Sequence, residues 1–354
     1  MASPSAPLDI LRRFAPGTRL RNAVDLILRQ GTGALVILGT GSVVEDLCTG
    51  GFELTDCGFS EQRLAELAKM DGGIVVDAEA ETIIRANVHF IPNSTIATDE
   101  TGTRFRTAER LAIQTGKTIL AVSEEGRSAA IVFTNSERYE LQNPTTLLAQ
   151  ANQNLNSLER LRRRLDAAED RLTRLEVEDV ATLRDAVVVI QRAALVDRLA
   201  SDIQSASVEL GGEAHLIRLQ AADLVEGVSD VAELVFLDYR RRRSRKRIAV
   251  LERLSSVTTP DLFDAKQVAG ALDLNPLDQP AGPRGLRALA LVPRLPDTVK
   301  DSLLAHFGSF QKMLRATVSE LDKVEGIGRA RAMQLRTYFD RIAEVGGGVW
   351  EIHE

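Results

Sequence analysis

The chain has 354 residues, of which 44% are hydrophobic and 27% are charged, and it carries a formal net charge of −6. This length allows two or three domains, and the composition is that of an ordinary soluble globular protein. The acidic balance excludes a chain that coats nucleic acid along its whole length, so a nucleic-acid contact requires a local basic patch. The two cysteines, Cys48 and Cys57, are too few for a disulfide scaffold or a zinc site.

No apolar stretch approaches the roughly 20 residues that cross a bilayer. The first segment, MASPSAPLDILRRFAPG, lacks the apolar core of a secretory signal. We therefore expect a cytoplasmic protein that makes no membrane contact.

Residues 8 to 145 alternate between helical and strand patterns. The spacing of apolar residues predicts helices over 20–30 and 60–70, the second with Ser60 as its N-cap. Short apolar runs predict strands over 34–39, 72–77, 118–125 and 129–134. Helices interleaved with short strands indicate an α/β layered domain, which we place at residues 1–145.

From Pro144 the pattern becomes helical, with two rows of apolar residues at seven-residue spacing, offset by three. Such rows are the a and d positions of a short coiled coil. The pattern predicts an all-α helical spine at residues 146–282, interrupted at Asp179 and ending in a linker rich in Pro and Gly at 275–285. The residues of the two rows are Leu158, Leu165, Leu172, Leu161, Ala168 and Leu175.

The last seventy residues hold two helix-turn-helix segments. The first, over 290–309, turns at Arg294-Leu295-Pro296, and the second, over 321–335, turns at Gly326-Ile327-Gly328. Both resemble helix-hairpin-helix motifs. We therefore predict a tandem helix-hairpin-helix DNA-binding domain at residues 283–354.

Within the second hairpin, Gly326 and Gly328 would expose backbone N–H groups beside a helix N-terminus, which suits a phosphate. A grip of this kind recognises the DNA backbone and its shape more than its sequence. A purely structural turn remains the alternative, because Gly-x-Gly alone is a weak motif. The first hairpin lacks both glycines and is expected to support the second. Basic residues that could add contacts to DNA are Arg329, Arg331 and Arg336.

A separate basic run extends from Arg240 to Arg247, with seven basic residues in eight. It is either an electrostatic contact for nucleic acid or a solvated loop, and the sequence favours neither.

A candidate nucleotide site lies in the N-terminal domain. Arg104 and Arg106 stand with Thr103 and Thr107 where a helix is predicted to begin, and guanidinium, hydroxyl and backbone N–H groups together suit a triphosphate. Surface ion pairing is the alternative interpretation of the arginines. No P-loop signature occurs in the chain.

Asp71 precedes Gly72 and Gly73 at the start of a predicted strand. A carboxylate there can hold a divalent metal, and the glycines leave room for a nucleotide to approach the backbone. The alternative is that Asp71 only terminates a helix. Nearby, Glu124 and Glu125 are candidates for a further metal contact. The lone His89 is more typical of a packing residue than of a catalyst.

Taken together, these segments resemble the bacterial DNA integrity scanning family of diadenylate cyclases over essentially the full length of the chain. The resemblance rests on Asp71-Gly72-Gly73, on Arg104-Phe105-Arg106 and on the flanking segments ELAKMDG, IRANV, TDETGTR and TAERLAIQTG. It implies a cyclase domain, a spine and a helix-hairpin-helix domain in that order. It also implies that two ATP become cyclic di-AMP and two pyrophosphates, between cyclase domains that face each other in a homo-octamer. Branched DNA bound at the C-terminal domain would suppress this synthesis.

The resemblance further implies roles for individual residues. Asp71 would bind Mg²⁺ or Mn²⁺ and help to activate the attacking 3′-hydroxyl, while Gly72 and Phe90 would line the nucleotide pocket. The segment that would hold the phosphates is Thr103, Arg104, Phe105, Arg106 and Thr107.

Two positions depart from the family pattern. Gly73 stands where the family has Ala, which removes only a methyl group and is expected to have little effect. Phe105 stands where the family has His, so an apolar ring replaces a phosphate donor and a slower or nearly inactive cyclase is expected. Three other functions therefore remain open: a cyclase-impaired DNA-binding scaffold, a DNA-repair nuclease, and a regulator that binds ATP without reacting. Against the nuclease, the chain lacks a clustered Asp/Glu pattern that would hold two metals.

Overall fold

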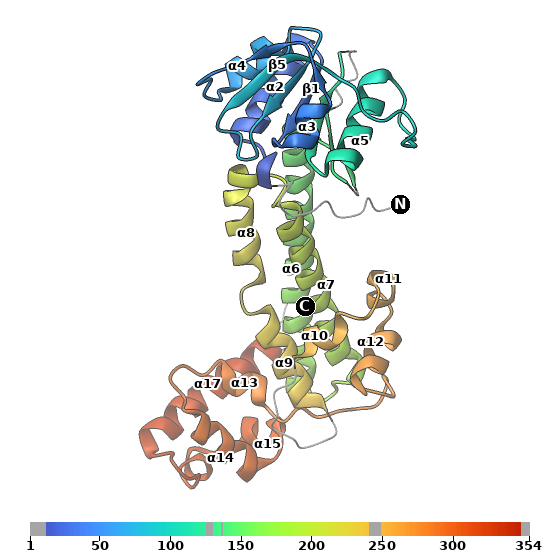
Figure 1. Ribbon diagram of the computed structural model, residues 1–354. Helices are drawn as coiled ribbons and strands as arrows, with labels where there is room; N and C mark the ends of the chain where they lie inside the picture. The colour runs from blue at the N-terminus through green and yellow to red at the C-terminus, as the bar shows by residue number, and fades with distance from the viewer. Residues whose placement is uncertain (1–11, 125–129, 136, 241–248, 348–354) are drawn as a thin grey trace, which may run out of the picture. The chain divides into compact units, whose positions relative to one another are not determined.

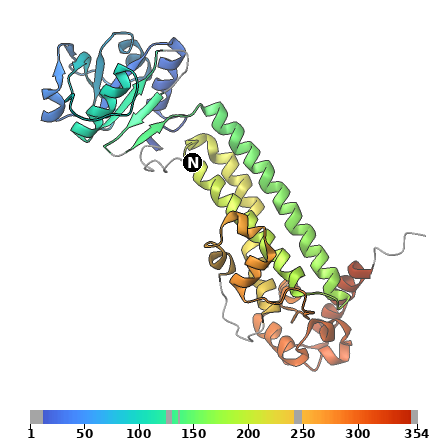
Figure 2. The ribbon, with the colours of Figure 1, turned by 90° about the vertical axis from the view of Figure 1, so that its right-hand side faces the viewer.

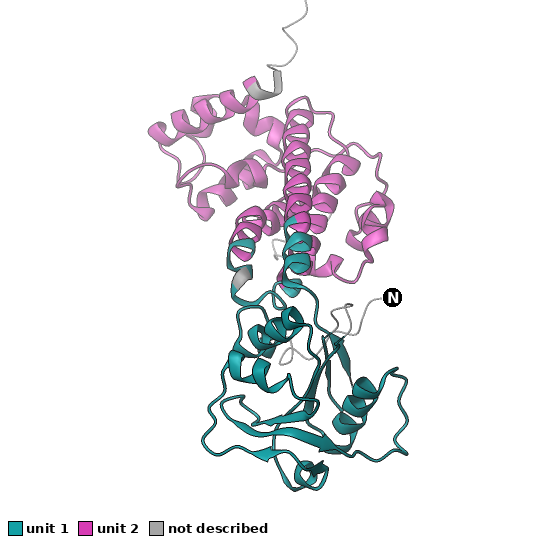
Figure 3. Ribbon diagram, turned by 90° about the horizontal axis from the view of Figure 1, so that it is seen from above, with its two compact units in different colours: residues 1–152, 205–217 teal, residues 153–204, 218–354 magenta. Residues whose placement is uncertain are grey.

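The structure is a computed structural model that describes residues 12–124, 130–135, 137–240 and 249–347 (Figure 1). The chain divides into two compact units (Figure 3). Unit 1 comprises residues 1–152 and 205–217, and unit 2 comprises residues 153–204 and 218–354. Unit 1 is a mixed α/β unit, whereas the described part of unit 2 is helical.

Unit 1 is built on a mixed sheet, which has eight strands among the described residues. The strand order is β2-β5-β4-β1-β6-β7-β8, and β3 also pairs with β5. Only the β1–β4 pair among these is parallel. The strands are β1 (Ala34–Leu38), β2 (Cys48–Thr49), β3 (Phe52–Glu53), β4 (Gly73–Val76), β5 (Ile83–Phe90), β6 (Thr118–Val122), β7 (Ala130–Phe133) and β8 (Arg138–Glu140).

Helices cover both faces of this sheet, so unit 1 has three layers (Figure 1). Successive residues of a strand point to opposite faces. Val36 of β1 accordingly packs into a core with Ile27 and Leu64, whereas its neighbour Ile37 packs into a second core with Leu111. The helices are α2 (Arg19–Gln30), α3 (Ser42–Asp46), α4 (Glu61–Leu67) and α5 (Thr103–Thr115).

The predicted α/β domain and its main helices and strands are confirmed. Ser60 caps α4 as predicted, its hydroxyl accepting from the Arg63 N–H at 3.2 Å. The ends of two predicted strands, at residues 125 and 129, lie outside the described residues. Periodicity did not predict α3, β2, β3, β5 or β8. Four of these five are short, and β5 carries an irregular register that obscures a two-residue alternation.

The predicted spine is confirmed as helix. It begins with α6 (Pro144–Val177), the long green helix in Figure 2, which continues from unit 1 into unit 2. Leu158, Leu165 and Leu172 are almost fully buried, at 0, 0 and 1% exposure, whereas the second heptad row is only half-buried. The helix ends two residues before Asp179, whose φ of 61° is left-handed.

One further long helix, α7, and several shorter ones complete the spine. The segment 275–285 is non-helical, as predicted, but it is tied to the start of α7 by backbone hydrogen bonds. The N–H of Arg184 donates to the Leu277 carbonyl at 2.8 Å, and the N–H of Ala281 donates to the Ala181 carbonyl at 3.0 Å. These elements are α7 (Leu183–Ala206), η1 (Gly211–Ala214), α8 (His215–Val225), α9 (Val228–Tyr239), α10 (Val250–Leu254), α11 (Thr259–Leu262) and α12 (Ala265–Leu272).

The C-terminal helices share one core, which includes Leu303, Phe310 and Leu335. Each of the two predicted turns contains a residue with left-handed backbone, Arg294 with a φ of 56° and Gly326 with a φ of 83°. These helices are α13 (Leu286–Ala290), α14 (Asp297–Phe307), α15 (Phe310–Arg315), α16 (Val318–Leu321) and α17 (Arg329–Gly347).

A buried polar cluster joins the C-terminal helices to the spine inside unit 2. The Asp238 carboxylate accepts from the backbone N–H of Gly285 at 2.9 Å and of Arg287 at 3.0 Å. The Arg287 guanidinium forms an ion pair with Glu176 near the end of α6, and Tyr239 donates to the same carboxylate at 2.9 Å. Burial raises the pKa of Glu176 and of Asp238.

In the described part of the chain, no helix has the length and apolar character that crossing a membrane requires.

Candidate functional site

A pocket of about 990 Å³ lies in unit 1, where the starts of β1, β4 and α5 meet the end of β5. Eight of the predicted nucleotide-site residues line it. Sequence reasoning did not single out four other lining residues, because none of them belongs to the short motifs at Asp71 and Arg104: Gly33, Glu100, Ser123 and Arg138. The eight predicted residues are Asp71, Gly72, Gly73, Phe90, Thr103, Arg104, Phe105 and Thr107.

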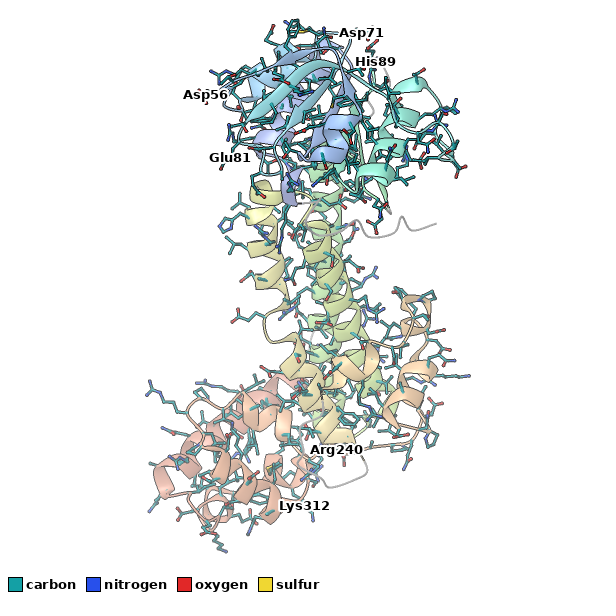
Figure 4. All side chains as sticks on the ribbon, in the orientation of Figure 1. Asp56, Asp71, Glu81, His89, Arg240 and Lys312 are labelled. Atoms are coloured by element: carbon teal, nitrogen blue, oxygen red, sulfur yellow. The ribbon has the colours of Figure 1, made fainter. Side chains whose placement is uncertain are left out.

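Asp71 is exposed and stands two residues before β4. In Figure 4 its side chain and that of His89 lie at the same end of the unit 1 sheet, and both residues line the pocket. His89 is exposed, so the prediction of a packing role is wrong. Gly72, the next residue, lies against β5, since a β-carbon there would stand 2.5 Å from the carbonyl carbon of Asn87. Close backbone approach is therefore one reason for glycine at position 72.

The first turn of α5 opens into the pocket. Its N-cap is Gly102, and no side chain caps the turn. Backbone N–H groups at a helix N-terminus lack intrahelical partners and favour an anion. Thr103 and Thr107 are four residues apart, so they lie on the same face of the helix, and both line the pocket. This end of α5 is suited to hold phosphate groups.

Arg104 extends from α5 across the start of β1. Its guanidinium passes so close to Gly33 that a β-carbon there would stand 2.2 Å from Nη1. It forms an ion pair with Glu124, whose side chain is 57% exposed. In the described structure this carboxylate neutralises the cation that the sequence assigned to a phosphate.

Phe105 and Arg106 are placed differently from Arg104. The Phe105 ring packs against the hydrophobic core that contains Phe90 and Leu111. Arg106 is exposed and is not among the described residues that line the pocket. Side chains two positions apart in an α-helix point about 200° apart around the helix axis. Arg106 therefore points away from the side of α5 on which Arg104 lies. The structure thus brings Arg104 to the pocket and leaves Arg106 outside it.

Three carboxylates of the described residues line the pocket, and two of them already have cations. Glu100 pairs with Arg138 at 2.5 Å, and Glu124 pairs with Arg104. Asp71 makes no ion pair with any described residue. The described residues contain no cluster of three metal-ligand side chains. Mg²⁺ commonly binds through one or two carboxylates, waters and substrate phosphates, so Asp71 suits such an ion. Glu125 lies outside the described residues.

The DNA-binding residues predicted in the second hairpin fall into two groups. Gly326, Gly328 and Arg329 are exposed at the turn, and the Arg329 side chain makes no hydrogen bond or ion pair with the described residues. By contrast, Arg331 donates to the Gly326 carbonyl at 2.8 Å. Arg336 donates to the carbonyls of Leu314 and Ala316 at 2.8 and 2.7 Å and pairs with Asp340 at 2.7 Å. Arg336 therefore joins α17 to the end of α15.

Of the basic run, Arg240 is described, and residues 241–247 lie outside the described residues. Figure 4 labels Arg240 at the end of α9. The structure therefore does not test the run as a contact for nucleic acid.

Comparisons with family models and with known proteins point to the same family. Residues 21–137 match the family described as DisA bacterial checkpoint controller nucleotide-binding, and residues 141–278 match the DisA bacterial checkpoint controller linker region. The DNA integrity scanning protein DisA of Parafrankia is 45% identical over 97% of this chain and 98% of its own length. That of Acidothermus cellulolyticus is 44% identical over 94% of this chain and 92% of its own length. A solved structure of DacA from Staphylococcus aureus is 18% identical over 38% of this chain and 88% of its own, with a TM-score of 0.31.

Proposed function

Because this chain belongs to the DisA family of DNA integrity scanning proteins, which are diadenylate cyclases, we propose that it condenses two ATP into cyclic di-AMP and two pyrophosphates. The observation that carries this proposal is the pocket of about 990 Å³ in unit 1, which gathers Asp71, Arg104 and the open first turn of α5. An acidic group, a cation and free backbone N–H groups in one pocket suit a nucleoside triphosphate with its metal.

In this proposal the triphosphate lies at the N-terminus of α5. The backbone N–H groups of the first turn and the hydroxyls of Thr103 and Thr107 donate to phosphate oxygens. Arg104 adds a guanidinium once Glu124 is displaced. The adenine packs on the apolar part of the lining, which includes Phe90. These contacts hold the α-phosphate at the pocket mouth, beside Asp71.

Asp71 would hold Mg²⁺ or Mn²⁺ together with the phosphates. Such an ion lowers the pKa of a nearby hydroxyl and neutralises charge on the transferring phosphoryl group. In each of the two transfers, the 3′-oxygen of one ATP forms a bond to the α-phosphorus of the other. The bond to the departing pyrophosphate breaks, and the hydroxyl proton leaves to solvent.

One pocket holds one ATP, so the reaction requires two copies of the chain with their pockets facing. Arg106 supports this arrangement, since it is exposed outside its own pocket and would be available to a facing nucleotide or protomer. We propose a homo-octamer as the assembly that supplies such pairs.

We further propose that α13 to α17 form a tandem helix-hairpin-helix domain that binds branched DNA without sequence preference and thereby suppresses synthesis. Its contact would be the turn of Gly326 and Gly328 with Arg329, where exposed backbone and one unpaired cation lie together. Cyclic di-AMP synthesis by Arg329→Ala is then expected to be suppressed less strongly by branched DNA than synthesis by wild type.

The test is cyclic di-AMP formation from ATP with Mn²⁺, followed by chromatography. Wild type is expected to make product, and Asp71→Asn is expected to lose at least ~100-fold of the rate because a neutral amide holds the metal poorly. Glu81→Gln is the matched control, since Glu81 is exposed in the same unit and lies outside the pocket. Equal rates for Asp71→Asn and Glu81→Gln would remove Asp71 from the mechanism.

A second candidate function is a DNA-binding scaffold with impaired cyclase activity. The observation that favours it is Phe105, which lines the pocket with an apolar ring and packs into the core beneath. Wild type without turnover, together with product from Phe105→His, would establish the scaffold. Turnover by wild type at a rate close to that of Phe105→His would exclude it.

A further inference from the structure

Unit 2 contains a second pocket with a different character, a groove of about 490 Å³ between α6 and α7. We call it the arginine groove, because four guanidinium groups line it: Arg164 and Arg171 from α6, and Arg184 and Arg192 from α7. All four residues belong to unit 2. The groove is separate from the nucleotide pocket, which lies in unit 1.

The positions of the arginines follow from helix geometry. Arg164 and Arg171 are seven residues apart, so they lie on the same face of α6, about 10.5 Å apart along its axis. Arg184 and Arg192 are eight residues apart on α7, on either side of Val188, which also lines the groove. Each helix therefore presents two guanidinium groups, one near each end of the groove.

The positive charge of the groove is largely uncompensated. Its one carboxylate among the described lining residues, Asp185, accepts from the Thr182 N–H at 3.0 Å and the Thr182 hydroxyl at 2.6 Å. Arg184 is held by Asp278 at 2.8 Å. Arg164, Arg171 and Arg192 form no ion pair or hydrogen bond with any described residue.

Arg192 adds an independent observation. Its Nε atom is buried and has no hydrogen-bond partner among the described residues. A buried donor without an acceptor is costly, and such donors are rare in folded proteins. Arg192 is therefore a lining residue whose hydrogen-bonding capacity the described residues leave partly unused.

The remaining lining is apolar and small. Ala167 and Ala168 leave space on α6, and Leu172 and Val188 complete an apolar surface. Guanidinium groups pair with phosphate oxygens in a planar, two-pronged geometry, and pockets of this volume hold small molecules. From the combination of unpaired arginines and an apolar floor, we propose that the arginine groove binds a nucleoside polyphosphate. The phosphates pair with Arg164, Arg171 and Arg192, and the base rests on the apolar floor.

The test is isothermal titration of the full-length chain with sodium tripolyphosphate and with ATP. Arg164→Ala and Arg171→Ala are each expected to lower the affinity of one class of binding sites, that of the arginine groove, about fivefold to tenfold. A change of this size is what the loss of a charge-assisted contact causes. Arg163→Ala is the matched control, because Arg163 is exposed on the same helix and lies outside the groove. Ala167→Leu, which fills the groove without a change of charge, is expected to weaken the binding of ATP.

Thermal unfolding of each variant separates loss of the site from loss of the fold. Equal binding by Arg163→Ala, Arg164→Ala and Arg171→Ala would overturn the proposal. A 20-base-pair DNA duplex provides the second arm. If Arg164→Ala and Arg171→Ala weaken duplex binding and leave the binding of both phosphate probes unchanged, the groove contacts a DNA backbone and the nucleotide proposal is wrong.

Discussion

The ring of Phe90 lies against the backbone of Gly73, so close that a β-carbon added to Gly73 would stand 1.9 Å from Cε2 of the ring. The ring has little room to withdraw, because Phe90 is 7% exposed and belongs to the core beneath α5. The sequence alone indicated that Gly73 differs from the family's Ala only by a methyl group. The structure adds a packing role, in which Gly73 and Phe90 are complementary in size.

Gly73→Ala is therefore expected to destabilise the chain. Overpacking of a core commonly costs about 1–3 kcal/mol of unfolding free energy, and chemical denaturation measures it. The double variant Gly73→Ala with Phe90→Leu is expected to recover most of the loss, since the smaller side chain leaves space for the methyl group. A single variant as stable as wild type would show that the ring can move aside.

Glu124→Gln is expected to bind ATP more tightly than wild type. The carboxylate that neutralises Arg104 must leave before a phosphate can take its place. Exposed ion pairs contribute about 0–1 kcal/mol, so the expected gain in affinity is at most about fivefold. Titration with a non-hydrolysable ATP analogue measures it, with Glu45→Gln, exposed and outside the pocket, as the control. Weaker binding by Glu124→Gln would instead favour a role for Glu124 in holding the metal.

Arg329 and Arg336 are expected to behave differently when each is replaced by Ala. Arg329 is exposed and unpaired among the described residues, so its loss should weaken DNA binding and reduce the salt slope by about 0.9 per phosphate contact, with stability unchanged. Arg336 joins α17 to the end of α15, so its loss should lower the free energy of unfolding by about 1–3 kcal/mol. Salt-dependent DNA titrations and denaturation measure the two effects. If Arg329→Ala lowers the free energy of unfolding and Arg336→Ala weakens DNA binding without loss of stability, the two assignments are wrong.

Asp77 makes the stability of unit 1 dependent on pH in the acid range. Burial alone would raise the pKa of its carboxyl group, but hydrogen bonds from Thr82 and from the backbone N–H of Glu81 outweigh it and lower the pKa below 3.8. Because the folded-state pKa is the lower one, the stabilisation is present above about pH 3.8 and is lost as the pH falls through the folded-state value.

Asp77→Asn should accordingly cost about 1 kcal/mol of unfolding free energy at pH 7, the size of one weakened hydrogen bond. The difference from wild type should shrink below pH 3.8. Denaturation at a series of pH values measures it. Glu79→Gln serves as the control, because Glu79 is exposed in the same turn. A difference that is constant from pH 7 to pH 3 would contradict the assignment.

The sequence by itself determined the elements whose signals are local. Apolar periodicity predicted α2, α4 and α6, short apolar runs predicted β1, β4, β6 and β7, and the motifs at Asp71 and Arg104 predicted two sides of one pocket. Each of these signals is contained within a few helical turns or one strand, where spacing alone reports which face is buried.

The tertiary structure decided what depends on segments that are distant in sequence. Strand β5 bulges at Asn87, so its pairing with β4 could not be read from a two-residue alternation. The pairing of Arg104 with Glu124, the contact between Gly73 and Phe90, and the convergence of four arginines on one groove each join separate elements. Such contacts depend on how helices and strands pack in space, which no local pattern of residues encodes.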